Sequence, residues 1–371
     1  MQISIDSIKS IKESHSEMFE HNTVKVMTEH FCNDVIDTSD YSVHDVIGVW
    51  YNIEIAQSLV NQGYKNVTLI TNEHDKGTQL LTNSPEFGIG ASYKTIDEVE
   101  GMKFDKMPGN PPWNKNLEGV SGYFYKHALT KALEEQLVDG GELKFILSAN
   151  LLTAPSLKQF RDYLLTYNVT QLEIYDNSKN QVFDITNQHV LIITIKKEAY
   201  QGTTKVVREI AGKVSSTQVD LTKYDHWPMY QDDIAKNIIH KVLDKSQGYL
   251  RVNPKVKYEP VASDNYVSFP ILVHDMSPYK VNNTDNYYVN DNHSVSDIGR
   301  FFFDTKAEAD LYLEFMKSPV YGLVHSSLKT MQKVQEKQMM IIGYQNFADN
   351  DFNKHFGFTT DEIEYLESIS E

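Results

Sequence analysis

Residues 43–71, VHDVIGVWYNIEIAQSLVNQGYKNVTLIT, decide the fold class of this chain. Val43–Val49 is rich in β-branched residues and predicts a strand. Apolar residues then recur at helical spacing, at Ile53, Ile55, Ala56, Leu59 and Val60, before Gly63 ends the helix. Val67–Thr71 is a second β-branched run. A strand, a helix and a strand in this order predict a βαβ unit and therefore a parallel sheet.

The same alternation continues to residue 200. The pattern predicts strands at Lys103–Met107 and Leu143–Leu147, helices at Tyr123–Leu137 (ending at Gly140-Gly141) and Leu157–Leu165, and a final strand pair at Val169–Tyr175 and His189–Lys196. Such alternation predicts an α/β domain, a mostly parallel sheet with helices on both faces. We expect this domain to span residues 43–200, after an N-terminal helical extension over residues 1–42.

Beyond residue 200 the composition changes. Tyr, Asn, Asp and Ser become frequent, and prolines interrupt the chain at 254, 260, 270 and 278. Two helices are predicted. One is Ala307–Met316, with Ala307, Leu311 and Phe315 expected on one face. The other is Asp361–Ser368, which opens with the capping residues Thr359–Glu362. These features predict a second, α+β domain over residues 201–371 with a closing C-terminal helix.

Charge and composition limit the functional classes. The chain has 371 residues, a net charge of −16 and one cysteine, Cys32, and its first thirty residues are polar. No apolar run reaches the roughly 18–20 residues that span a bilayer. We therefore expect a cytoplasmic protein without a signal peptide, disulfide or membrane partner. Phosphate contacts favour Lys and Arg, so the acidic total opposes a broad nucleic-acid surface. Salt screens the electric field of each charge beyond about 10 Å, so a local basic groove is compatible with a negative total charge.

The stretch FDKMPGNPPW, Phe104–Trp113, carries the chemistry. It predicts a strand that ends in a loop made rigid by proline, since each proline fixes its own φ and restricts the residue before it. The Asn110 side chain and the Pro111 carbonyl are thus two fixed acceptors at the carboxyl end of a strand, where open α/β sheets bind ligands. They can accept both hydrogens of an amino group, while Trp113 offers a face for an aromatic ring.

This stretch resembles the active-site motif of the N6-adenine DNA methyltransferases of restriction-modification systems, which reads Asn-Pro-Pro followed by an aromatic residue. The resemblance extends over Tyr123–Leu129, Gly140–Leu152 and Leu157–Leu165, and loosely over Asn353–Glu367. It implies a Rossmann-like class I methyltransferase domain followed by a target-recognition domain. It also implies S-adenosyl-L-methionine as cofactor and double-stranded DNA as partner, with methyl transfer to a flipped-out adenine.

The resemblance assigns roles to individual residues. The catalytic residues would be Asn110, Pro111, Pro112 and Trp113. Phe183 would sandwich the flipped base with Trp113. The cofactor would contact Thr28, Gly48, Glu73 and Asn110. Thirteen histidines without metal-ligand spacing and one cysteine predict no metal site.

One departure from the family concerns the turn after the first strand. The family has a glycine-rich turn there, whereas this chain has one glycine, Gly48, followed by Trp50 and Tyr51. Glycine permits close backbone approach, so we expect the two aromatic residues to obstruct the cofactor or to stack near it. This predicts weak cofactor binding by the free protein, with DNA, a partner protein or a second copy of the chain completing the pocket.

Three alternatives to DNA adenine methylation stay open. RNA adenine methylation would use the same four residues. Protein-glutamine methylation also uses Asn-Pro-Pro with an aromatic, although the long C-terminal part argues against it. A catalytically impaired protein that binds DNA or acts as a decoy would explain the acidic charge and the altered turn.

Overall fold

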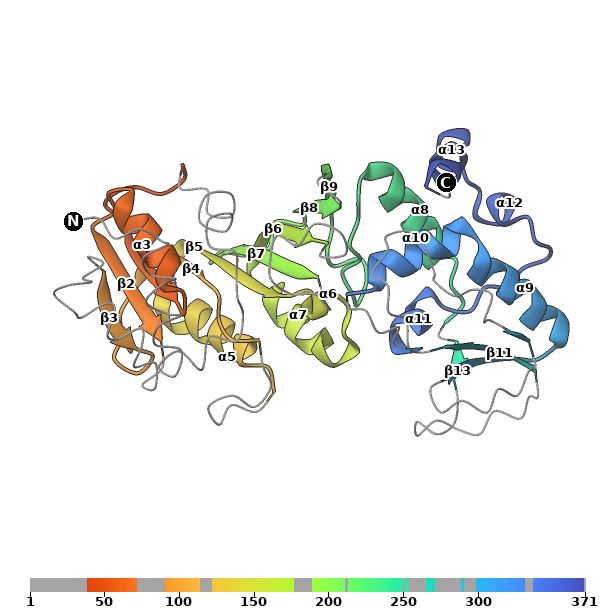
Figure 1. The fold of residues 1–371 in the computed structure, drawn as a ribbon, viewed down its shortest axis with the longest axis horizontal. Coiled ribbons are helices and arrows are strands. Elements are labelled where there is room, and N and C mark those ends of the chain that lie inside the picture. The colour runs from red at the N-terminus through yellow and green to blue at the C-terminus, as the bar shows by residue number, and fades with distance from the viewer. Residues whose placement is uncertain are drawn as a thin grey trace, which may run out of the picture.

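The structure is a computed structural model (Figure 1). It describes residues 39–71, 91–113, 122–176, 189–210, 213–248, 250–252, 265–270, 288–289, 298–330 and 336–369. The N-terminal strands lie at one end of an elongated molecule, and helices with a small sheet lie at the other. Almost all of the predicted extension over residues 1–42 falls outside the described residues.

A nine-stranded sheet organises the N-terminal part. Its strands are β1 (Val46–Trp50), β2 (Asn66–Thr71), β3 (Ser92–Thr95), β4 (Phe104–Gly109), β5 (Leu137–Ser148), β6 (Asn168–Tyr175), β7 (Val190–Lys196), β8 (Thr204–Ile210) and β9 (Lys213–Val219). The order is β3-β2-β1-β4-β5-β7-β6-β8-β9. Strands β3 to β5 are parallel, and β7 runs antiparallel between β5 and β6. This is the strand order of a Rossmann-like class I methyltransferase domain, so the expected fold class is confirmed.

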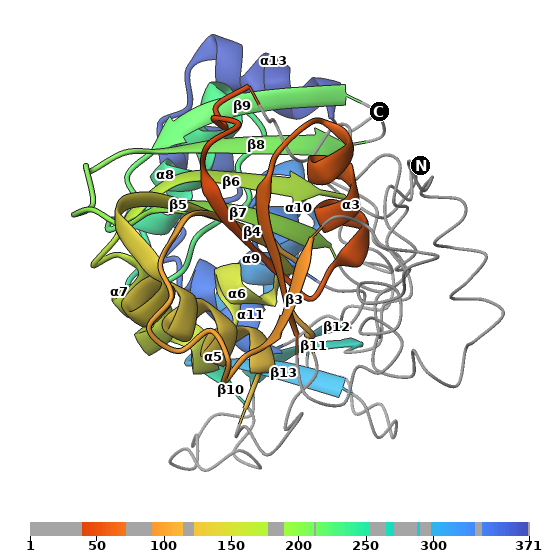
Figure 2. The same ribbon diagram turned by 90° about the vertical axis from the view of Figure 1, so that its left-hand side faces the viewer.

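Helices cover the two faces of this sheet separately. Helix α3 (Ile53–Asn61) packs with Ile47 and Val49 of β1 on one face. The opposite face packs on α5 (Phe124–Lys131), the π-helical turn η4 (Ala132–Gln136), α6 (Asn150–Thr153), η5 (Pro155–Leu157) and α7 (Lys158–Leu164). Figure 2 shows α3 on one side of the strands, with α5 and α7 on the other. The alternation along β1 thus supplies two cores.

The helix after residue 123 ends at Gln136, within one residue of the predicted Leu137, but the predicted role of the two following glycines is wrong. Gly140 and Gly141 do not stop a helix but lie inside β5, and the helix ends earlier, in η4. A Cβ on Gly141 would lie 2.9 Å from the backbone oxygens of Asp105 and Val138. These glycines therefore allow β4 and β5 to approach where their register shifts, between Phe104 and Lys106.

The sheet also continues past the boundary expected at residue 200. Strand β8 pairs in parallel with β6, and β9 pairs antiparallel with β8. A boundary between residues 200 and 201 would cut one sheet between β7 and β8. The sequence pattern misses this extension because β6, β7 and β8 follow one another without an intervening helix, so the βαβ alternation is absent.

The C-terminal part combines helices with a small sheet, as the sequence predicts. Its helices are α8 (Asp233–Asp244), α9 (Lys306–Lys317), α10 (Pro319–Leu328), α11 (Glu336–Ile342), α12 (Phe352–Phe356) and α13 (Thr360–Ser368). Strands β10 (Arg251–Val252), β13 (Ile298–Phe303), β11 (Asn265–Pro270) and β12 (Tyr288–Val289) form an antiparallel sheet in that order.

Both predicted C-terminal helices form. Helix α13 begins at the expected capping residues, where Thr359 and Glu362 exchange side-chain and backbone hydrogen bonds. In α9 the buried face differs from the expected one. It consists of Ala309, Tyr312, Phe315 and Met316, whereas Ala307 is exposed.

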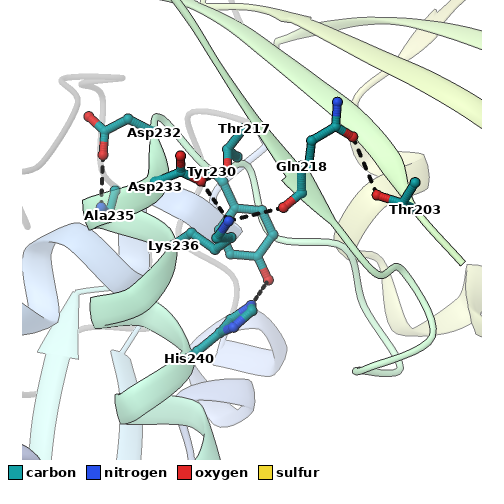
Figure 3. A network of polar contacts seen from close by, with 9 residues as sticks. All are labelled: Thr203, Thr217, Gln218, Tyr230, Asp232, Asp233, Ala235, Lys236 and His240. Atoms are coloured by element: carbon teal, nitrogen blue, oxygen red, sulfur yellow. Dashed lines mark hydrogen bonds and ion pairs between the residues drawn. The ribbon is translucent and has the colours of Figure 1, made fainter.

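Polar contacts join the C-terminal part to the last strand of the large sheet (Figure 3). Lys236 of α8 donates to the Gln218 carbonyl at 3.0 Å, and Asp233 accepts from the Thr217 hydroxyl of β9. A single apolar cluster runs from Phe145 of β5 to Phe315 of α9. The two parts therefore share one continuous core.

Three buried histidines make stability depend on pH. Burial lowers the pKa of His226 to about 4 and that of His325 to about 3, and it also lowers the pKa of His189, against the opposing charge of Asp176. Between pH 4 and 6.5 the unfolded chain binds more protons at these residues, so folding weakens as the pH falls. Lowering the pH from 7.5 to 5.5 should reduce the free energy of unfolding by about 1.4 kcal/mol per histidine. Urea unfolding at the two pH values measures this, and His325→Gln should reduce the pH difference. Equal free energies at both pH values would contradict the prediction.

Candidate active site

The predicted motif lies where two central parallel strands end side by side. Trp50, the last residue of β1, pairs in register with Gly109, the last residue of β4. The Asn110 backbone N–H then donates to the Trp50 carbonyl at 2.9 Å. The residues after both strands thus meet at the carboxyl edge of the sheet, the edge where open α/β sheets bind ligands.

Asn110 presents an unused acceptor at this edge. The residue is 9% exposed, and its Oδ1 is buried without a hydrogen-bond partner among the described residues. A buried, unsatisfied acceptor costs about 1–3 kcal/mol. Pro111 and Pro112, both buried, follow it directly and restrict the backbone. The arrangement suits a ligand that brings a hydrogen-bond donor to Oδ1.

Trp113 lies in the core and not on an open surface. Its side chain is 6% exposed, and its Nε1 donates to the Ile146 carbonyl of β5 at 3.2 Å. It belongs to the apolar cluster of Val190 and Ile192, on the sheet face that α3 covers in part. The indole buries a large apolar area there while its N–H finds an acceptor. Little of the ring is therefore free for the predicted stacking on a base.

Trp50 does not obstruct the turn as expected. Its indole is fully buried on the opposite face of the sheet, where Nε1 donates to Gln136 Oε1 at 3.1 Å and the ring packs near Phe145. Gly109 makes this position possible, because a Cβ there would lie 2.6 Å from the Trp50 Cβ and 2.8 Å from its carbonyl oxygen. The close fit of Trp50 and Gly109 fixes the backbone immediately before Asn110.

Tyr51 takes the backbone conformation that a glycine would supply. Its φ is 58°, the only positive φ of a non-glycine residue in the described part of the chain. For an L-residue this region costs about 1–2 kcal/mol. The ring packs edge-on against Phe124 of α5, with centroids 5.5 Å apart. The turn after β1 therefore keeps a glycine-like backbone shape while carrying a bulky side chain.

Gly48 is not in that turn. It is the third residue of β1 and pairs with Thr68, and a Cβ there would lie 2.9 Å from the Phe104 ring. Its position serves strand packing, and the expectation that it lines a cofactor site in the turn is wrong. The other predicted site residues, Thr28, Glu73 and Phe183, lie outside the described residues.

The C-terminal part reaches the same edge of the sheet, which sequence reasoning misses. The Thr330 hydroxyl donates to Asn150 Oδ1 at 2.9 Å, and the Thr330 carbonyl accepts from the His189 backbone N–H at 3.0 Å. Next to them the buried Asp176 lies 3.5 Å from His189 and 3.8 Å from Arg208. No local motif signals these contacts, because they join segments far apart in the sequence.

Among the described residues no group of three or more His, Cys, Asp or Glu side chains is placed to hold a metal ion. Within that same part of the chain, no helix is long and apolar enough to cross a bilayer.

Comparisons with known proteins give low similarity. No family model and no curated protein sequence matches the chain. Among solved structures, the type IIG restriction endonuclease BpuSI matches at 10% identity and a TM-score of 0.40, over 100% of this chain and 61% of its own. The EcoKI M protein, from a type I restriction enzyme, matches at 11% identity and a TM-score of 0.35, over 44% of this chain and 44% of its own.

A type I methyltransferase subunit from Streptococcus thermophilus matches at 13% identity and a TM-score of 0.33, over 53% of this chain and 49% of its own. The chain thus matches about half the length of these two type I subunits. The fold assignment rests on the order and directions of the strands, and not on these low scores.

Proposed function

We propose that this chain is an S-adenosyl-L-methionine-dependent methyltransferase that methylates the exocyclic amino nitrogen of adenine in double-stranded DNA. The observation that carries the proposal is the buried, unpaired Oδ1 of Asn110 at the carboxyl end of β4. A buried acceptor left without a partner is costly unless a substrate group pairs with it. The resemblance carried by Asn-Pro-Pro-Trp suggests which substrate group pairs with Oδ1: an amino nitrogen with two hydrogens to donate.

The chemistry needs a more nucleophilic amine. The adenine amino group is a weak nucleophile because its lone pair is delocalised into the ring. Asn110 Oδ1 and the Pro111 carbonyl would accept its two hydrogens, favour a tetrahedral nitrogen and direct the lone pair. The bound cofactor supplies an electrophilic methyl group on sulfur. With that methyl group in place, the N–C bond would form as the C–S bond breaks, and the nitrogen would then release one proton to solvent. Positioning and fixed dipoles supply the acceleration.

The residues present fit such a cofactor in part. The left-handed backbone at Tyr51 would leave the turn after β1 open to the cofactor's approach, and Asn110 lies beside this turn through its hydrogen bond to the Trp50 carbonyl. Thr28 and Glu73 remain proposed contacts, as do Trp113 and Phe183 for the base. Stacking on Trp113 would require the covered ring to be exposed when the base enters.

The proposed division of labour follows the fold. The catalytic part would extend to Val219 at the end of β9, beyond the boundary expected from the sequence. The C-terminal part would select the target sequence, since Thr330 brings it to the catalytic edge. The bulky side chain of Tyr51 in the turn favours one second candidate function: a protein with impaired cofactor binding that still binds DNA. Such a protein would act alone, with a partner protein or with a second copy of the chain.

Asn110→Ala should reduce methyl transfer about 100-fold or more, because it removes an acceptor positioned for the reacting nitrogen. The free energy of unfolding should stay equal or rise, since the lost oxygen has no partner. Transfer of labelled methyl groups to unmethylated duplex DNA measures the first effect, and urea unfolding measures the second.

Asn168→Ala is the matched control, because this buried asparagine uses both amide atoms at the amino end of β6, with Glu198 at 2.7 Å and Gln201 at 3.3 Å. It should lower stability and leave turnover intact. Wild-type turnover in a folded Asn110→Ala protein would refute the mechanism. If the wild type methylates RNA or a glutamine peptide and not DNA, the proposed substrate is wrong.

Gly109→Ala should also impair turnover while Asn110 itself is unchanged. Its Cβ would meet the Trp50 Cβ at 2.6 Å and carbonyl oxygen at 2.8 Å, so the backbone that carries Asn110 must move. We expect kcat to fall about 10-fold or more. Gly141→Ala is the control, because its Cβ meets backbone oxygens at 2.9 Å away from the motif. If both variants lose stability and neither loses kcat, the fit of Trp50 and Gly109 does not position Asn110.

Tyr51→Gly should strengthen cofactor binding to the free protein about 10-fold, because glycine adopts the left-handed conformation without strain and leaves space in the turn. Calorimetric titration of S-adenosyl-L-methionine without DNA measures this. Tyr51→Ala separates the two causes, since it removes the ring and keeps the strained Cβ. Tight binding by the unmodified protein would show that Tyr51 does not weaken the site.

A further inference from the structure

The chain contains only four arginines, Arg161, Arg208, Arg251 and Arg300, against thirty-one lysines. Two of them are structural. Arg161 is buried and donates to the backbone carbonyls of Asp225, Leu151 and Ala154. Arg208 is also buried, donates to the Met229 carbonyl and lies 3.8 Å from Asp176. The internal structure of the protein therefore accounts for these two guanidinium groups.

Arg300 of β13 is different. Among the described residues its side chain forms no hydrogen bond or ion pair, and its Nε is buried without a partner. The guanidinium carbon lies 4.9 Å from the centroid of the Tyr266 ring on β11. A guanidinium that is stacked on a ring but has no anion keeps its terminal NH2 donors available.

The small sheet has two unlike faces. Val267, Phe269, Phe301 and Phe303 are buried in the core, together with α9. Figure 1 shows β11 and β13 beside α9 and α11. Tyr266, Arg300 and Phe302 alternate with these residues and are partly exposed, while Ser268, the register partner of Arg300 on the same face, is buried. The Tyr266 and Phe302 rings lie 5.8 Å apart. We call these three residues the aromatic–arginine face.

The strand register adds the remaining arginine. Arg251 of β10 is the register partner of Phe302, and Tyr266 is the partner of Phe302 on its other side. Arg251 and Arg300 thus lie on two adjacent strands, β10 and β13, of one small sheet.

We propose that the aromatic–arginine face binds a DNA strand, with Arg300 at a phosphate and an unpaired base against Tyr266 and Phe302. Arginine suits this role because its planar group can donate two hydrogen bonds to one phosphate while it stacks on a ring. Aromatic rings on an open sheet face hold unstacked bases without reading their sequence. Salt screens the distant acidic surface beyond about 10 Å, so a local site of this kind tolerates the negative total. The proposal deepens the proposed function and rests on it for the choice of DNA.

Fluorescence anisotropy tests the proposal by measuring how the full chain binds a fluorescein-labelled single-stranded DNA oligonucleotide. The titrations are made at about 50, 100 and 200 mM NaCl, so that the salt dependence of the affinity is also obtained. Arg300→Gln should weaken binding about 10-fold and lower the slope of log affinity against log salt by about 1. Tyr266→Leu and Phe302→Leu should weaken binding about 10-fold and leave the slope unchanged. Arg300→Lys keeps the charge, so it should keep the slope and lose part of the affinity.

Lys306→Gln is the charge-matched control, because Lys306 is exposed and already paired with Asp310 at 2.7 Å. It should change neither affinity nor slope. Circular dichroism confirms that each variant is folded. Unchanged affinity and slope in folded Arg300→Gln would overturn the proposal, as would tighter binding of an RNA oligonucleotide of the same sequence. The binding assay does not depend on methyl transfer, so the two proposals can fail separately. If Arg300→Gln loses DNA binding but the wild type methylates no DNA, only the proposed function is refuted. If the wild type methylates DNA but binding does not depend on Arg300, only this inference is refuted.

Discussion

The fit between Trp50 and Gly109 is the constraint on which the candidate site depends. A parallel sheet brings the last residues of β1 and β4 together, and their approach leaves no room for a side chain on Gly109, since a Cβ there would lie 2.6 Å from the Trp50 Cβ. The same pair supplies the carbonyl that accepts from the Asn110 backbone. Gly109 therefore determines both the packing of Trp50 beneath the sheet and the position of Asn110 at its edge.

This constraint changes the meaning of the unusual turn after β1. Two aromatic residues replace the small residues expected there, and both side chains pack into the same apolar cluster, with ring centroids 6.1 Å apart. Trp50 is turned into the core, and Tyr51 accepts a strained backbone conformation to keep the shape of the turn. Strain that persists in a well-packed region is a marker of functional sites, because the surrounding structure has to maintain it.

Local patterns in the sequence predict much of this molecule. The β1–α3–β2 unit, the position of Asn110 after a strand and the capped helix α13 all follow from residues within a few positions of each other. The errors share one cause, since each depends on a distant partner. The direction of the Trp50 side chain depends on Gly109, and the burial of Trp113 depends on β5 and β7. Likewise β8 is a strand of this sheet only because β6 offers it an edge, and the contact of Thr330 with Asn150 crosses most of the chain.

The continuous core that joins both parts of the chain limits how either part can be exchanged. Domains that fold independently can be exchanged as units. Here Phe145 of the large sheet and Phe315 of α9 belong to the same apolar cluster, so a foreign C-terminal part would leave the large sheet with an unmatched surface. A substitution on a surface outside this shared core changes what that surface can bind without disturbing the packing that holds the two parts together.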